Sequence, residues 1–521
     1  MKNSSVGVCS AMVGLRTRAF SGWTCRATPH FLRPMRLLAA VVLMLGCFPG
    51  GITAGAQEAN WQSIPVPPLP EFHPKEPKRV ALPNGMVLFL QEDHELPLIN
   101  GFARIRGGSY SEPANKTGMA EIYGEVWRTG GTKTETGDQL DDFLEARAAK
   151  VETGDGGDST SIGLSCLKQD FDDVFKVFVD LLENPEFRAD KLQLAQSEAF
   201  DAISRRNDDI NEIVSRETAK LGYGAESPYA RVPEYATVSA ITRQDLLDWH
   251  RTHVYPNNII LGLSGDFDSA AMETKLREAF KSWQKGPTVK DQEFPITPAK
   301  PGYYLIDKQD VSQSAVRLIN PGTTRRNPDF YAIEVFNDAF GGGFGSRLFS
   351  NIRSIQGLAY SVGGGIGTGW DHPALTRFGA DTKSQSTVES IQALYQQIGN
   401  LKNSPIDDEE IRRAKDSILN SFIFNFDTPE KVLREKMAYE FFRYPMDFLE
   451  RYRAGIEKVT TADVARIPPK YLHQPQMQVL VVGHKEEFDK PLTSLGPVTP
   501  LDITIPPPPG QAPAGQEKPS Q

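Results

Sequence analysis

The same order of predicted elements occurs twice in this 521-residue chain. A polar, proline-containing stretch at 286–300 separates the two copies. Each copy begins with paired strands, continues through helices and ends in a buried strand, at 258–266 in the first copy and 478–483 in the second. The helical segments 189–203 and 408–421 also match in position and period. The sequence therefore predicts an α+β fold built by tandem duplication, with two sheets each backed by helices. Two unrelated domains are the less favoured alternative, because the order of elements agrees throughout.

The composition is that of a globular protein with large cores, with 39% hydrophobic and 24% charged residues. The net charge is −9 and no basic run is present, which argues against nucleic acid as a partner. Cys166 is the one cysteine outside the first 56 residues, so no internal disulfide is expected. It lies in an alternating run, which predicts a strand residue rather than a nucleophile. No transmembrane segment is expected, because no stretch is long and apolar enough.

The first 56 residues differ from the rest, since they contain six Lys or Arg and no Asp or Glu. An apolar run at 37–47 and the small residues Ala54-Gly55-Ala56 follow, as in a secretory signal peptide. A secreted or periplasmic location is therefore expected. Two alternatives remain open: an Arg-rich mitochondrial transit peptide, and a lipid anchor at Cys47.

The remaining boundaries follow from composition. A Pro-rich extension is predicted at 57–75, and the two similar domains at 76–285 and 301–490 flank the linker at 286–300. The C-terminal segment 491–521 is rich in proline and is predicted to be disordered. A hairpin is predicted in the first domain, because Asn84-Gly85 separates two apolar runs.

Several short motifs appear in order along the two domains. They are GMAEIYGEVWRTGGT at 118–132, LLENPEF at 181–187, SPY at 227–229, HVYPNN at 253–258, GGGFGSRLF at 341–349 and GLAYSV at 357–362. Together they resemble the pitrilysin/insulysin family of inverzincin metallopeptidases, in the branch of the bacterial and mitochondrial processing peptidases. The resemblance covers about residues 76–490. It implies that each half is a pitrilysin-like unit, a mostly antiparallel sheet backed by helices.

The resemblance locates a zinc motif that this chain lacks. Family members carry H-x-x-E-H on a helix, with two His ligands and a Glu that acts as general base. In this sequence Glu121 and Glu125 occupy the His positions and Gly124 occupies the base position. Glu198 matches the third ligand. No metal or other cofactor is therefore expected in this chain, and zinc is expected in a partner subunit.

Three carboxylates on one face could still hold an ion. Glu121 and Glu125 are four residues apart and share a helical face. With Glu198 they would favour a hard cation over zinc. The other interpretation, which we favour, is a solvated acidic surface whose members repel one another and have raised pKa values. Hydrolysis is not expected in either case, because Gly124 offers no base.

The second half keeps two functional residues of the family, whereas the first half lacks the zinc-binding histidines and the base. Arg353 and Tyr360 match a family pair, seven residues apart, that binds the substrate backbone and stabilises the oxyanion. The resemblance also implies substrate contacts elsewhere. These are Glu152 and Thr153 on a peptide-pairing edge strand, and Gly341, Gly342 and Gly343 in a flexible glycine-rich loop. The H-x-x-H pair of His250 and His253 lies in a segment that the family uses structurally.

These features predict a non-catalytic, substrate-binding subunit of a heteromeric zinc metallopeptidase. It would bind peptides or unfolded polypeptides and contribute Arg353 and Tyr360 to the zinc site of an H-x-x-E-H-containing partner. The alternative is a non-proteolytic binding or scaffold protein that forms a homodimer. Autonomous catalysis is the least favoured hypothesis.

Overall fold

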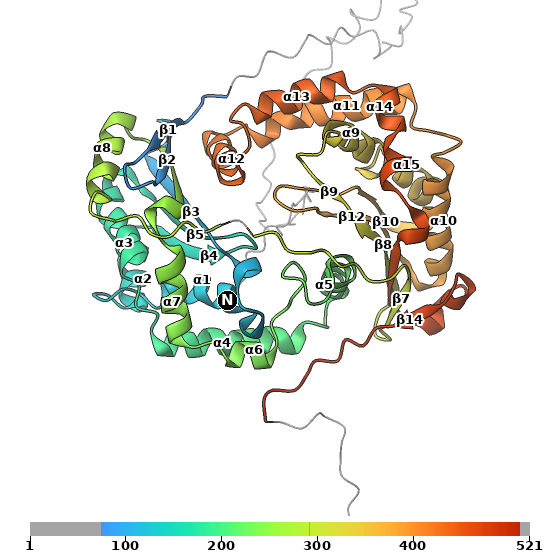
Figure 1. Ribbon diagram of the computed structural model, residues 1–521, viewed down its shortest axis with the longest axis horizontal. Helices are drawn as coiled ribbons and strands as arrows, with labels where there is room; N and C mark the ends of the chain where they lie inside the picture. The colour runs from blue at the N-terminus through green and yellow to red at the C-terminus, as the bar shows by residue number, and fades with distance from the viewer. Residues whose placement is uncertain (1–73, 291, 511–521) are drawn as a thin grey trace, which may run out of the picture. The chain divides into compact units, whose positions relative to one another are not determined.

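The computed structural model of the protein describes residues 74–290 and 292–510. The predicted leader at 1–56 and most of the predicted extension at 57–75 lie outside the described residues. The described residues form two six-stranded sheets, with helices packed against each (Figure 1). One sheet belongs to each half of the chain, so the prediction of an α+β fold with two units is confirmed.

The first sheet has the strand order β1-β2-β6-β3-β5-β4, which leaves β4 at one edge. The strands are β1 (Lys78–Ala81), β2 (Val87–Glu92), β3 (Leu98–Arg106), β4 (Lys150–Asp155), β5 (Ser159–Leu167) and β6 (Ile259–Gly265). All neighbours are antiparallel except β2 and β6. The predicted hairpin joins β1 to β2, and Gly85 in its turn has φ +90°, in the left-handed region that favours glycine.

The first half contains eight α-helices in its described part, and all but α5 belong to the layer on one face of this sheet. They are α1 (Met119–Thr129), α2 (Gly137–Glu145), α3 (Phe171–Glu183), α4 (Ala189–Arg205), α5 (Ile210–Tyr223), α6 (Tyr235–Ser239), α7 (Arg243–His253) and α8 (Ser269–Ala279). The strands β3 and β5 alternate buried and partly buried side chains, with Cys166 among the buried ones. Every residue of β6 is buried, which requires cover on both faces of the sheet.

The second sheet repeats the arrangement, with the order β10-β12-β8-β13-β7-β14. Its strands are β7 (Gly302–Asp307), β8 (Gln313–Pro321), β10 (Ala359–Gly365), β12 (Leu375–Lys383), β13 (Gln478–Gly483) and β14 (Val498–Pro500), and a small separate sheet pairs β9 (Thr323–Thr324) with β11 (Thr368–Gly369). Its helices are α9 (Phe330–Gly341), α10 (Thr387–Asn400), α11 (Asp408–Phe422), α12 (Pro429–Phe442), α13 (Phe448–Lys458), α14 (Thr461–Ala465) and α15 (Ile467–Tyr471). The strand β10 occupies the position that β4 has in the first sheet.

One helix of each half packs against the sheet of the other half. The helix α5 packs Ile213 and Val214 against second-sheet residues that include Ile319 and Leu480. In return α12 packs Leu433 and its neighbours against β2 and β6 of the first sheet. These exchanged helices supply the second cover that the fully buried strands β6 and β13 need. The two halves are therefore interlocked through apolar cores rather than joined only by the linker.

The C-terminal segment has more structure than the sequence predicts. Disorder is predicted over 491–521, but the structure describes this segment as far as Gly510, and the prediction is wrong for that part. The strand β14 pairs in parallel with β7. Beyond it Leu501 and Ile503 pack against the cluster under α5, and Ile505 packs against the first-half core. The physical reason is the alternation of apolar and polar side chains at 501–505, which partly buries every second residue.

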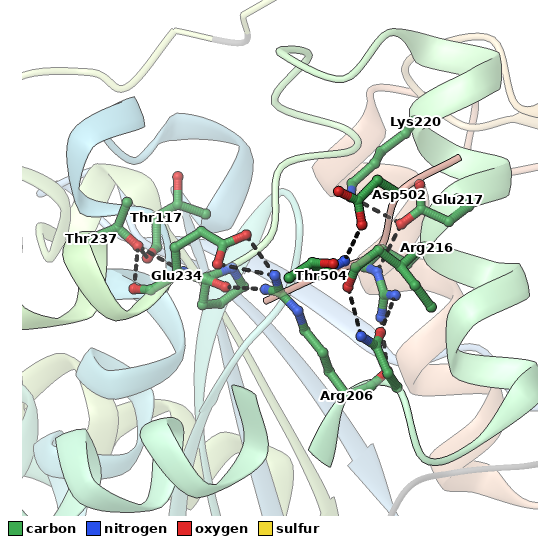
Figure 2. Close-up of polar contacts among 12 residues, drawn as sticks. Thr117, Arg206, Arg216, Glu217, Lys220, Glu234, Thr237, Asp502 and Thr504 are labelled. Carbon is green, nitrogen blue, oxygen red and sulfur yellow. Dashed lines mark hydrogen bonds and ion pairs between the residues drawn. The ribbon is translucent and has the colours of Figure 1, made fainter. Parts of the chain in front are cut away.

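Polar contacts also hold this segment, at the connection between α4 and α5 (Figure 2). Asn207 donates from Nδ2 to the carbonyl of Ile503 at 2.7 Å, and its Oδ1 accepts from Arg216 at 2.7 Å. The backbone carbonyl of Asn207 accepts from Lys308 Nζ at 3.0 Å. A loop of the first half is thereby tied to the second sheet and to the C-terminal segment.

Candidate functional site

The start of α1 is fixed by a side chain from outside the helix. Gly118 precedes the helix with φ +100°. The buried Glu112 accepts hydrogen bonds from the backbone N–H of Gly118 at 3.0 Å and of Ala120 at 2.9 Å. It thus satisfies two donors that the end of a helix leaves unpaired. This orientation presents Glu121 and Glu125 on one face of α1, as the spacing predicts.

The structure brings the three glutamates of the former zinc motif together. The carboxyl of Glu125 is hydrogen-bonded to that of Glu198 on α4, and Glu121 lies close enough to repel it. Burial, the hydrogen bond to Glu198 and the two neighbouring charges raise the pKa of Glu125 to about 7. Desolvation and the charge of Asp155 raise the pKa of Glu121 as well. The trio is therefore a crowded acidic surface in which Glu125 takes up a proton near neutral pH.

This proton predicts how stability depends on pH. The pKa of Glu125 rises from near 4.5 to about 7 on folding, so the folded chain binds the proton more tightly than the unfolded chain. The free energy of unfolding should therefore fall as pH rises from about 4.5 to 7, and stay lower above 7. Glu125→Gln should flatten this dependence, by about 1 kcal/mol after allowance for screening by water. Denaturant unfolding at a series of pH values measures it. Glu145→Gln, at an exposed residue of α2, is the control, and equal flattening in that variant would contradict the assignment.

The surroundings of Gly124 explain why no glutamate can stand at the position of the general base. A Cβ at this residue would lie 2.9 Å from the carbonyl carbon of Gly154 and 3.0 Å from the nitrogen of Asp155. The hydroxyl of Thr153 also donates to the carbonyl of Gly124 at 2.5 Å. The helix α1 and the edge strand β4 are thus in backbone contact here. The position has no space for a glutamate side chain.

The strand β4 has two different faces. Thr153 turns toward α1, as its hydrogen bond shows, whereas Glu152 is exposed and lines a groove of about 270 Å³. Phe102, Leu433 and Arg434 also line that groove. Because β4 is an edge strand, its outer backbone groups are not paired within the first sheet.

Arg353 and Tyr360 lie side by side in the second half. The guanidinium carbon of Arg353 is 5.4 Å from the centre of the Tyr360 ring. Arg353 belongs to a π-helical turn at Phe349–Ile355 and Tyr360 to β10. The Tyr360 side chain is 77% exposed, and Phe344 and Ile355 nearby in sequence are exposed to a similar degree. Among the described residues, no hydrogen bond or ion pair joins Arg353 to the glutamate trio.

The glycines of the loop after α9 serve different purposes. A Cβ at Gly341 would lie 2.2 Å from the carbonyl oxygen of Gly364, and one at Gly342 would meet the backbone of Asp338. These two glycines are required for close packing. Gly343 has φ +153° and faces open space. Of the three glycines, Gly343 is the one with space beside it for a ligand.

The two histidines are structural. His250 is bonded to the Tyr123 hydroxyl at 2.8 Å and to the carbonyl of Leu182 at 3.0 Å, and burial lowers its pKa to about 4. His253 stacks on Trp249 with ring centres 3.9 Å apart. Within residues 74–290 and 292–510, no three His, Cys, Asp or Glu side chains are arranged to hold a metal ion. The closed Gly124 position and the all-carboxylate trio do not fit a catalytic zinc ion.

Sequence reasoning missed two residues of this region. Glu112 caps α1, and the charge of Asp155 adds to the desolvation that raises the pKa of both Glu112 and Glu121. The run Gly154-Asp155-Gly156-Gly157 is a turn signal and could have indicated that β4 ends beside the helix. The approach of β4 to Gly124 has no signal in the local sequence.

Family models match most of both halves. The model described as insulinase (peptidase family M16) matches residues 103–224, and the model described as peptidase M16 inactive domain matches residues 240–418. Together they cover more than half of the chain. This chain belongs to the peptidase M16 family. It is a member that carries the fold without the zinc motif.

Two relatives illustrate its place in the M16 family. The non-peptidase homolog YmxG of Helicobacter pylori is 23% identical over 86% of this chain and 98% of its own length. An uncharacterized zinc protease of Mycobacterium leprae is 24% identical over 76% of this chain and 89% of its own length.

Solved structures share the M16 fold. A peptidase M16 inactive domain from Pseudomonas fluorescens has a TM-score of 0.72 and 22% identity, covering 80% of this chain and all of its own. The periplasmic protease PqqL from Escherichia coli has a TM-score of 0.66 and 15% identity, over 80% of this chain and 48% of its own. In the part of our M16 protein that the structure describes, no helix combines the length and apolarity needed to cross a bilayer.

Proposed function

We propose that this M16 protein is the non-catalytic, peptide-binding subunit of a heteromeric zinc metallopeptidase. The observation that carries the proposal is the contrast between its two halves. The base position at Gly124 is closed by β4, whereas Arg353 and Tyr360 form an exposed pair. The partner would be a family subunit with an intact H-x-x-E-H motif and zinc, and both subunits would be secreted or periplasmic.

Substrate binding would use the edge of the first sheet. The strand β4 is an edge, and the groove beside Glu152 is lined by both apolar and charged side chains. A peptide in extended conformation can pair with such an edge through its backbone, whatever its sequence. This supports unfolded polypeptides as the substrate class.

Arg353 and Tyr360 would act on the partner's reaction. A guanidinium and a phenol are hydrogen-bond donors, and donors placed where negative charge develops lower the barrier to acyl transfer. The exposure of Tyr360 leaves its hydroxyl accessible to a second subunit.

The test is a peptidase assay on the complex of this chain with its H-x-x-E-H partner. Arg353→Ala should lower kcat about 100-fold, and Tyr360→Phe about 10-fold, with smaller changes in KM, because the donors act in the transition state. Arg453→Ala on α13 is the matched control, since Arg453 is exposed and forms an ion pair with Glu457 on the same helix.

Two outcomes would overturn the proposal. Undiminished turnover in Arg353→Ala would remove the role of the pair. A stable homodimer that binds peptide but no zinc-bearing subunit would instead favour the scaffold alternative. Mass photometry of the chain with and without the partner distinguishes these assemblies.

A further inference from the structure

A second hollow lies in the C-terminal half, and neither the glutamate trio nor Arg353 lines it. It has a volume of about 660 Å³ and is lined by α9, the end of α11, α12 and α13. Its walls are largely aromatic, formed by Phe330, Trp370, Phe422, Tyr439, Phe448 and Tyr452. The volume is in the range of sites for small organic ligands.

One guanidinium of this cavity, that of Arg325, has an N–H group without an acceptor among the described residues. The guanidinium of Arg325 lies over the Trp370 ring, with its central carbon 3.9 Å from the ring centre. Its Nε is buried without a hydrogen-bond partner. No ion pair or side-chain hydrogen bond joins Arg325 to another residue in the described part of the chain. A buried N–H donor without an acceptor is costly, and the Nε of Arg325 is such a donor.

The carboxylates of the cavity are already engaged. Glu334 accepts from the hydroxyl groups of Thr368 at 3.0 Å and Tyr452 at 3.4 Å. Glu435 is hydrogen-bonded to Tyr439. Burial raises the pKa of Glu334 and Glu435, and the charge of Arg325 opposes this rise at both carboxyl groups. Arg325 therefore acts on both through its charge without forming an ion pair or hydrogen bond with either.

We propose that this cavity binds an organic carboxylate with an aromatic or apolar body. The planar guanidinium offers two parallel N–H donors to a carboxylate, and its stacking on Trp370 fixes that plane. The aromatic walls offer faces and edges on which a ring can stack. The ligand would be either a small aromatic acid or the C-terminus of a polypeptide. This site is separate from the proposed proteolytic role, and it can exist whether or not that role is correct.

Calorimetric titration of the full chain tests this with N-acetyl-phenylalanine and its C-terminal amide. The acid should bind at least ten times more tightly than the amide, because only the acid carries the carboxylate. Arg325→Gln should abolish binding of the acid. The neighbouring Arg326→Gln is the matched control and should retain it, since Arg326 donates instead to the carbonyl of Phe442. Arg353→Ala should also retain it, which separates this site from the proposed catalytic pair.

Three results would overturn the proposal: no binding of the acid, equal binding of the amide, or tighter binding of phenethylamine, which would indicate a cation site. If Arg325→Gln fails to fold, the comparison of acid, amide and amine on the unaltered chain still decides. A ten-residue peptide ending in phenylalanine distinguishes the two sources. Tighter binding than the small acid, lost on amidation, identifies a polypeptide C-terminus, and equal binding identifies a small acid.

Discussion

Restoring the zinc motif by Glu121→His, Gly124→Glu and Glu125→His should give an inactive and strongly destabilised protein. The loss should be about 4 kcal/mol, since side-chain atoms at residue 124 would overlap backbone atoms of β4 that no rotamer change can move. A Cβ alone would lie 2.9 Å from the carbonyl carbon of Gly154. Denaturant unfolding measures the loss, and a peptidase assay with added zinc measures activity.

The matched control changes Glu121 and Glu125 to histidine and leaves Gly124 intact. These side chains lie on the accessible face beside Glu198, so the double variant should fold normally. Two histidines and Glu198 match the ligands of a zinc site, and zinc should raise its Tm without producing hydrolysis. If the triple variant were as stable as the original chain and cleaved peptide, the contact between α1 and β4 would not close the site.

Breaking one exchanged helix should unfold the sheet of the opposite half. Ile213 is fully buried on α5 against the second sheet, and Leu433 is buried on α12 against the first. Ile213→Asp or Leu433→Asp should each cost about 4 kcal/mol or more, because a carboxylate would be buried without a partner. Hydrogen exchange should rise in β8 and β13 for the first variant, and in β2 and β6 for the second.

Ser215→Asp is the control for α5, because it adds the same charge at an exposed position of that helix. Its hydrogen exchange should match that of the original chain. Loss of protection confined to the half that carries the substitution would show that the halves are stable independently, which would contradict the interlocked cores.

Local patterns predicted much of this fold. The turn at Asn84-Gly85 follows from a local turn signal, and the duplication of the two units follows from the order of the predicted elements. The helix that carries Glu121 and Glu125 followed from the family resemblance. The meeting of Glu198 with that helix followed from the family motif. These features depend on residues whose environment is fixed by their own element, or by a resemblance that spans both halves.

The features that the sequence did not predict depend on which helix or strand packs against which sheet. Periodicity shows that α5 has an apolar face, but not that a sheet from the other half covers it. The closed position at Gly124 depends on the path of β4, about thirty residues later in the chain. In the C-terminal segment, proline content obscured the alternation of Leu501, Ile503 and Ile505, which determines where that segment packs.

The exchange of α5 and α12 also has a consequence for biosynthesis. A chain made from its N-terminus completes β2 and β6 long before α12 has been translated. Until then one face of the first sheet exposes apolar residues such as Phe89 and Ile260, which α12 later covers. The nascent first half therefore exposes apolar surface of the kind that chaperones bind, and a chain that terminates before residue 429 retains that exposed surface.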